Sequence, residues 1–424
     1  MEKAKLFEKL LKEELVPALG CTEPIAIALA ATKAREVLGV MPTTCEALVS
    51  GNIIKNVKSV VVPGTNGLKG IDAACITGIV AGDSSLNLEV LKNVTANDVV
   101  KIKELLDSNF CKVSHLQSNE VLHIIVKLSA GDDTCVVELK RSHANIVHIE
   151  KNGKVLFDSD QKQNEEVKFD FDLKDIYDFA SAGDISPVIP TIRREIECNM
   201  AICHEGLQGD YGQSVGRTLL GIYGDETKVR ARALAAAGSD ARMNGCAMPV
   251  VINSGSGNQG ITVCVPVVVF GESLKVSDDR LLRALVLSNL VAIYLKRGIG
   301  KLSAYCGVVS ASCGAGAGIT FVCGGGFELI SQTITNTIAN VSGIVCDGAK
   351  SSCAAKIASS VDAAIIGHFM SMSNKVFASG DGIVKDTVEG TINSISRIGK
   401  DGMKETDNEI LSIMLEKGNG YNGD

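Results

Sequence analysis

The chain has 424 residues and a formal net charge of −7, and it is 46% hydrophobic and 21% charged. This composition is typical of a globular protein with a large core, and a prior of about 150 residues per domain gives two or three domains. No Lys/Arg cluster is interleaved with aromatic residues, which argues against nucleic acid as a partner.

The N-terminal stretch MEKAKLFEKLLKEEL is amphipathic and charged. It has no apolar segment of ~7–15 residues of the kind that marks a secretory signal. We therefore expect a cytoplasmic protein whose fourteen cysteines stay reduced. Most of them should be small buried hydrophobes, and a few are candidate metal ligands or nucleophiles.

The first elements in the chain are predicted to be helices. Leucines near 3.6-residue spacing predict a helix over 5–19, which GCTEP (20–24) interrupts. Thr22 is a candidate cap for a second helix over 25–39, which Gly39 ends. The sequence PGTNGLKG (63–70) then predicts a loop that leads into a buried helix.

The pattern changes after about residue 90. Apolar alternation, β-branched residues and an Asn-Gly turn signal predict a small antiparallel sheet preceded by a helix. Helical periodicity returns near residue 188, with helices expected over 188–204, 213–222, 227–237, 278–297, 328–341, 349–372 and 405–417. We therefore predict an α+β fold in which a mainly helical domain (1–90 and 185–424) is interrupted by an inserted α+β domain (91–184).

Two long stretches, 243–271 and 302–327, contain no charged residue. Uncharged stretches of ~20 residues can span a bilayer. These two are rich in Gly, Ser, Asn and Gln, and they lack the aromatic belts expected at membrane interfaces. Buried helices and a glycine-rich loop are the preferred interpretation, with no membrane as partner.

The segment GIVCDGAKSSCAAK (343–356) places Cys346 and Cys353 seven residues apart. On a helix, this spacing would put both on one face, two turns apart. A catalytic iron–sulfur cluster needs three cysteine ligands and one iron left open, as in open zinc sites. Candidate third ligands are Cys306, Cys313 and Cys323. From spacing alone, buried structural cysteines are the favoured interpretation.

Cys21 lies just before a predicted helix N-terminus, where the positive end of the helix dipole lowers a thiol pKa. A reactive thiolate, a general base and a packing role all remain open. The loop INSGSGNQG (252–260) is either a cradle of N–H donors for a small anion or a tight connection between buried helices.

The histidines suggest no site. Cys203 and His204 would point in different directions on a helix, and His143 and His148 would face opposite sides of a strand. We interpret all four as structural. The sequence shows no HExxH motif and no convincing lysine context for pyridoxal phosphate.

Five motifs taken together resemble one family. They are LVPALGCTEPIAIALA, VPGTNGLKG, MPVVINSGSGNQGI, KLSAYCG and SGIVCDGAKSSCAAK. From near residue 15 to beyond residue 390, the chain is similar to the L-cysteine desulfidase family, which is related to the alpha chain of iron–sulfur L-serine dehydratases.

The resemblance implies roles for individual residues. Cys306, Cys346 and Cys353 match the family's ligands of a [4Fe-4S] cluster, and Cys21 matches the position of the catalytic base. Cys313 and Cys323 are treated as packing. The substrate contacts that it suggests lie in the 252–260 loop, at Ser254, Gly255, Ser256 and Asn258.

The implied activity is that of a carbon–sulfur lyase that does not use pyridoxal phosphate. L-cysteine would undergo β-elimination to hydrogen sulfide, ammonia and pyruvate, with the cluster acting as a Lewis acid. An enzyme of this kind is expected to be oxygen-sensitive. The alternative is an L-serine dehydratase, which performs the same elimination with hydroxide as the leaving group. A homodimer is expected from base rates.

Overall fold

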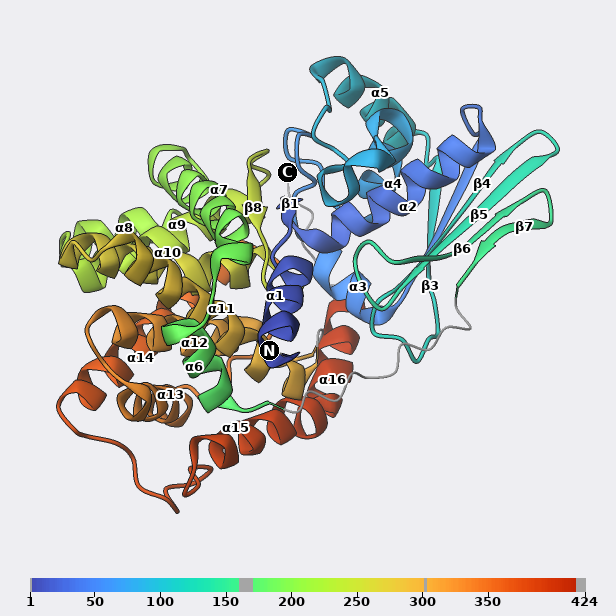
Figure 1. Cartoon of the computed structure of the whole chain (residues 1–424). Helices are drawn as coiled ribbons and strands as arrows, with labels where there is room; N and C mark the ends of the chain where they lie inside the picture. Colours follow the sequence, from blue (N-terminus) through green and yellow to red (C-terminus); the bar gives the residue numbers. More distant parts are fainter. Residues whose placement is uncertain (1, 160–170, 301–302, 417–424) are drawn as a thin grey trace.

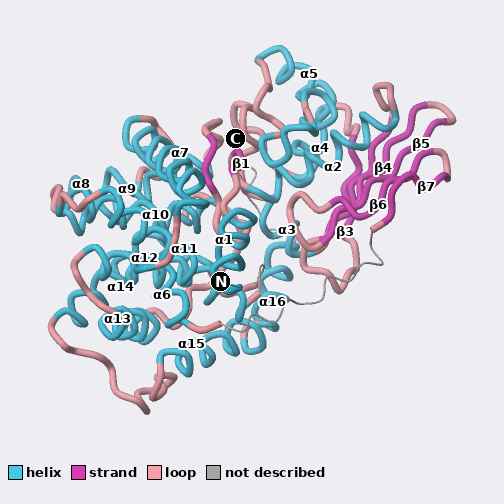
Figure 2. Tube along the Cα trace, viewed as in Figure 1, coloured by secondary structure: helices cyan, strands magenta, loops and turns pink. Residues whose placement is uncertain are grey.

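The computed structural model describes residues 2–159, 171–300 and 303–416, and it shows a mainly helical α+β protein (Figure 1). Most helices gather on one side of the molecule, and the strands of one large sheet gather on the other (Figure 2). The predicted fold class is therefore confirmed.

The N-terminal region alternates short strands with helices. Its elements are α1 (Glu2–Glu14), β1 (Pro17–Leu19), α2 (Thr22–Leu38), β2 (Thr44–Val49), α3 (Gly51–Val57) and α4 (Ile71–Ala81). The first helix ends earlier than predicted, because the residue before Pro17 is disfavoured in the α conformation. The second helix starts at Thr22 with Cys21 as its N-cap residue, so Thr22 itself is not the cap.

The large sheet has six strands in the order β3-β2-β4-β5-β6-β7. Its later members are β3 (Cys111–His115), β4 (His123–Ala130), β5 (Asp133–Lys140), β6 (Ile146–Lys151) and β7 (Lys154–Asp158), which follow η1 (Ser84–Glu89) and α5 (Ala96–Asp107). All neighbours are antiparallel except β2 and β3, which are parallel. Alternate residues are buried along β2, β4 and β5, and α2 packs against β4 and β5.

The large sheet includes a strand from outside the predicted inserted domain (91–184). Strand β2 comes from before residue 91, so the sheet extends beyond the segment expected to form it alone. Its hydrophobic strand residues and those of α2 belong to one continuous core that also includes the helical region. The division into a helical domain and an inserted domain remains a prediction.

The helical region contains every helix predicted after residue 188. Its elements are α6 (Leu173–Ala182), η2 (Ser186–Val188), α7 (Ile189–Gln208), α8 (Val215–Tyr223), α9 (Thr227–Met243), β8 (Pro249–Val251), α10 (Gly257–Leu274), α11 (Asp278–Ile299), α12 (Gly307–Val322), α13 (Phe327–Asn340), α14 (Cys353–Met372), α15 (Val388–Arg397), η3 (Ile398–Gly402) and α16 (Lys404–Leu415).

Helices α10 and α12 occupy the two uncharged stretches and are almost wholly buried by their neighbours. Glycine allows this close packing: a Cβ at Gly314 would lie 2.3 Å from the carbonyl oxygen of Ser288 on α11. Within the described part of the chain, no helix is long and apolar enough to cross a membrane.

Two short strands connect the N-terminal segment to the helical region. β1 pairs with β8 in an antiparallel sheet, with Pro17 opposite Val251. β1 leads into α2, and β8 leads into the 252–260 loop. The Thr22 hydroxyl donates a hydrogen bond to the carbonyl oxygen of Gly255 (2.9 Å), which fixes the start of α2 beside that loop.

Candidate functional site

The N-termini of four helices surround one small cavity of about 100 Å³. Cys21 is the N-cap residue of α2, Ser256 that of α10 and Cys306 that of α12, while Cys353 is the first residue of α14. Helix N-termini carry partial positive charge and free N–H groups. The cavity is therefore suited to thiolates and to an anionic ligand.

Backbone pairing brings Cys306 and Cys346 together from positions forty residues apart. The N–H of Cys306 donates to the carbonyl of Ile344 (2.9 Å), and the N–H of Cys346 donates to the carbonyl of Ala304 (2.7 Å). An isolated antiparallel bridge between Tyr305 and Val345 lies between these two bonds. Both cysteines line the cavity as a result.

The loop between Cys346 and Cys353 is shaped by its Asp-Gly pair. Gly348 has a φ of +99°, and a Cβ there would lie 2.2 Å from the carbonyl oxygen of Lys55, so only glycine fits. The Asp347 carboxylate forms ion pairs with Lys350 and Lys356. The turn thus folds back so that both cysteines reach the same cavity.

The three predicted cluster cysteines have different protonation preferences. A hydrogen bond from Cys306 lowers the pKa of Cys346 to about 6 despite burial, and the Lys55 charge lowers it further. The same contact, together with burial, raises the pKa of Cys306, and burial raises that of Cys353. One of the three is therefore a thiolate at neutral pH even without a bound group.

The chemistry of these residues suits an iron–sulfur cluster. Cys306, Cys346 and Cys353 offer three thiols to one cavity, and cysteine thiolates are the usual ligands of such clusters. The residues therefore fit a [4Fe-4S] group.

The other two candidate ligands lie elsewhere. Cys313 is fully buried in the middle of α12, and Cys323 lies at the C-terminal end of that helix, away from the end that Cys306 caps. Neither lines the cavity. Both positions agree with a packing role.

Cys21 lines the cavity, but its thiol is protonated. It donates a hydrogen bond to Oε2 of Glu23 at 3.1 Å. Burial raises its pKa well above the ordinary value, and the negative charge of Glu23 raises it further. The expectation that the helix terminus lowers this pKa is therefore wrong, because burial and the adjacent carboxylate outweigh the helix dipole.

Glu23 is a buried carboxylate that the sequence did not single out. It also accepts hydrogen bonds from Thr22 (3.1 Å) and Asn56 (3.3 Å), and it lies 3.7 Å from Nε2 of His143. Burial alone would raise its pKa, but His143 and the Cys21 thiol lower it to about 2. Glu23 is thus ionised and orients the Cys21 thiol.

His143 reaches the site from the turn between β5 and β6. We interpreted it as structural because His143 and His148, five residues apart, were expected to face opposite sides of a strand, whereas His143 lies in a turn. Its ring lies against Gly255 and is buried, and Nε2 has no hydrogen-bond partner among the described residues. Only the packing of the sheet against α2 reveals this contact.

The predicted substrate loop divides into two parts. Ser256 and Asn258 line the cavity, whereas Ser254 and Gly255 do not. Ser254 has a φ of +49°, and its hydroxyl donates to the side chain of Asn253 (2.9 Å). Ser254 and Gly255 shape the loop, and their contact with a substrate remains a prediction.

Cations and unpaired polar atoms complete the cavity. Arg242 donates to Oδ1 of Asn258 (3.2 Å) and keeps its buried Nε without a partner in the described chain. Lys296 is buried, which lowers its pKa to about 8 although the nearby Cys346 and Cys306 oppose that change. Oε1 of Gln259 is also buried and unpaired within the described residues. These unpaired polar atoms are available to hydrogen-bond a water, an ion or a substrate in the cavity.

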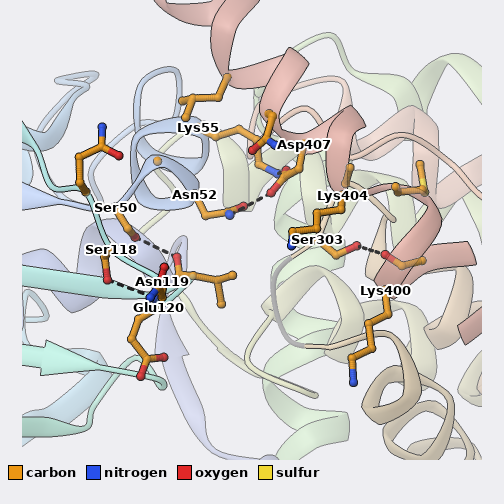
Figure 3. Close-up of a pocket in the computed structure, with 18 of the residues that line it drawn as sticks. Ser50, Asn52, Lys55, Ser118, Asn119, Glu120, Ser303, Lys400, Lys404 and Asp407 are labelled. Atoms are coloured by element: carbon orange, nitrogen blue, oxygen red, sulfur yellow. Dashed lines mark hydrogen bonds and ion pairs between the residues drawn. The ribbon is translucent and has the colours of Figure 1, made fainter. Parts of the chain in front are cut away.

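A second, larger cavity of about 830 Å³ lies beside the first, between the loop after β3 and the elements around α16 (Figure 3). Asp407 on α16 bonds to Asn52 (2.9 Å) and forms an ion pair with Lys55, both on α3. Ser303 lines both cavities. Lys55 thus lines the outer cavity while its charge acts on Cys346.

Fold and site together define a mainly helical α+β protein with a cysteine-lined cavity that also contains Arg242 and Lys296. A family model described as the serine dehydratase alpha chain matches residues 85–412, and the chain belongs to this family. Cys21 lies outside the matched stretch.

Relatives match nearly the whole chain. A UPF0597 protein of Lachnoclostridium phytofermentans is 57% identical over 96% of this chain and 98% of its own length. UPF0597 proteins of Desulfitobacterium hafniense and Finegoldia magna are each 50% identical, over 96% and 97% of this chain and 96% and 100% of their own lengths. The predicted relation to the alpha chain of serine dehydratases is confirmed.

Proposed function

We propose that the protein is an L-cysteine desulfidase, a lyase that converts L-cysteine and water to pyruvate, ammonia and hydrogen sulfide. One observation supports this most strongly: Cys21, Cys306, Cys346 and Cys353, from three separate segments, line one cavity that also holds buried cations. Nothing in the sequence order of these residues requires them to meet.

Cys306, Cys346 and Cys353 would hold a [4Fe-4S] cluster through their sulfurs. When bound, the cluster supplies a Lewis-acidic iron that polarises the substrate. Helix N-termini carry partial positive charge around the cavity, and the charge of Lys55 favours the Cys346 thiolate. The chain's own contribution is to bind, orient and deprotonate the amino acid.

The substrate carboxylate is the natural partner of the buried cations. Lys296 and Arg242 both line the cavity, and Arg242 keeps one buried N–H donor unused by the described residues. The side chains of Asn258 and Ser256, in the first turn of α10, offer further hydrogen bonds. These groups would fix the carboxylate and turn the Cα–H bond toward Cys21.

Proton removal from Cα is assigned to Cys21. A thiol is no base, so its own proton must leave first, to the solvent, because Glu23 accepts the thiol hydrogen bond at 3.1 Å but with a pKa of about 2 is too weak a base to keep the proton. Positive charge from Arg242 favours the resulting thiolate. Loss of the proton and of sulfide leaves aminoacrylate, which tautomerises to an imine and hydrolyses to pyruvate and ammonia.

The second candidate substrate is L-serine, which the matched family model favours by its description. The test is to supply the anaerobically reconstituted chain with L-cysteine and L-serine separately. Pyruvate should form from L-cysteine with one hydrogen sulfide per pyruvate, and with a higher kcat/KM than from L-serine. A higher kcat/KM for L-serine would assign the dehydratase activity instead, and no pyruvate from either would reject both.

A further inference from the structure

A second group of three cysteines lies outside the cavity. Cys45 is on β2, Cys75 on α4 and Cys111 on β3. The sulfur of Cys45 lies 3.4 Å from the sulfur of Cys75 and 3.4 Å from that of Cys111. All three sulfurs lie within 4.8 Å of one another. None of these residues lines either cavity.

Strand pairing and helix packing bring these three thiols close together. Cys45 and Cys111 are direct partners in the parallel pairing of β2 with β3, and α4 packs over both strands. Cys45 and Cys75 are buried, whereas Cys111 is partly exposed on the edge strand. The group therefore has one side through which an ion can enter.

We propose that Cys45, Cys75 and Cys111 bind a single d¹⁰ metal ion, Zn²⁺ or Cu⁺, separate from the iron–sulfur site. Thiolates on one tetrahedral zinc lie about 3.8 Å apart, given Zn–S bonds of ~2.3 Å. The observed 3.4 Å separations need only a small outward movement of the sulfurs. Soft thiolate donors select Zn²⁺ and Cu⁺ over hard cations.

The charge around the group favours a cation. The carboxylates of Asp72 and Glu46 act on these thiols and add negative charge nearby. Binding of Zn²⁺ would release the thiol protons.

This arrangement differs from that of the candidate cluster cysteines. Among the described residues, only the sulfurs of Cys45, Cys75 and Cys111 form a set of three that all lie within 4.8 Å of one another. The bound ion would join β2, β3 and α4, and thereby stabilise the edge of the sheet. The inference does not depend on the proposed function.

The test measures metal in the full-length chain, purified anaerobically and passed over a chelating resin. Zinc and copper are counted by mass spectrometry, and metal-edge X-ray absorption counts the sulfur ligands. We expect one such ion per chain with three sulfur ligands. Cys75→Ser and Cys111→Ser should each weaken Zn²⁺ binding by more than ~100-fold, since loss of a ligand costs at least as much as loss of its supporting shell.

Cys135→Ser is the matched control, because Cys135 is buried in β5 of the same sheet but is not part of the group. It should keep the ion, and iron and labile sulfide should be unchanged in all three variants. The inference is overturned if micromolar Zn²⁺ and Cu⁺ leave the wild-type chain without bound metal, if two of the three thiols form a disulfide instead, or if Cys135→Ser loses the ion equally. If a variant fails to fold, the number of sulfur ligands on the metal in the wild-type chain still tests the inference.

Discussion

Replacing Glu23 with glutamine should destabilise the fold at neutral pH. The pKa of Glu23 falls from 4.5 to about 2 in the folded chain. Each pKa unit corresponds to about 1.4 kcal/mol, so ionised Glu23 stabilises the fold by at most about 3 kcal/mol. Because the folded-state pKa is the lower one, this contribution is complete above pH 4.5 and is lost as the pH falls toward 2.

Glu195→Gln provides the contrast. Glu195 is also fully buried, but there burial raises the pKa to about 8, although a hydrogen bond from Asn289 opposes the change. Wild-type stability therefore falls as the pH rises from 4.5 to 8. The free energy of unfolding of Glu195→Gln, relative to that of wild type, should increase by about 3 kcal/mol between pH 5.5 and 7.5. The corresponding loss for Glu23→Gln should stay constant over the same range.

The assay is urea unfolding of the reduced, cluster-free chain at pH 5.5, 6.5 and 7.5, followed by circular dichroism. A loss below about 1 kcal/mol for Glu23→Gln at pH 7.5 would refute the account of Glu23 as a buried carboxylate held ionised by His143 and Cys21. A pH-independent effect of Glu195→Gln would refute the assignment of a raised pKa to that residue.

Three further predictions concern the cavity. Cys346→Ala should lose iron, labile sulfide and pyruvate formation together, while the control Cys313→Ala should keep all three. A full iron count in Cys346→Ala would contradict the assignment of Cys346 as a cluster ligand. Cys21→Ser should keep its iron but lose ~10²–10⁴-fold in kcat, as expected for a general base, and unchanged turnover would remove Cys21 from the mechanism. Lys296 has a pKa of about 8, so KM should rise above pH 8 as the positive charge of this residue is lost. Lys296→Met should raise KM at pH 7 and should abolish the rise above pH 8. A wild-type KM in that variant would exclude Lys296 from carboxylate binding.

Local sequence patterns were sufficient for much of the helical region. Helical periodicity located most helices after residue 188, and the start of α2 was placed within a few residues of Cys21. The helices in the two uncharged stretches were expected, but their bounds were not predicted, because a helix that is apolar on every side has no distinguishing periodicity. The bounds of these helices, α10 and α12, are recognised only once their neighbours are seen to cover them.

The sequence by itself determined which residue types are available for chemistry, the regions in which most helices form, and a family resemblance strong enough to single out four cysteines. Only the tertiary structure decided which of these groups meet. The Tyr305–Val345 bridge joins Cys306 to Cys346, and the sheet carries His143 to Glu23. It also gathers Cys45, Cys75 and Cys111. Propensity and periodicity act over a few residues, whereas these contacts join segments tens to hundreds of residues apart and arise only when separate elements bury their apolar faces together.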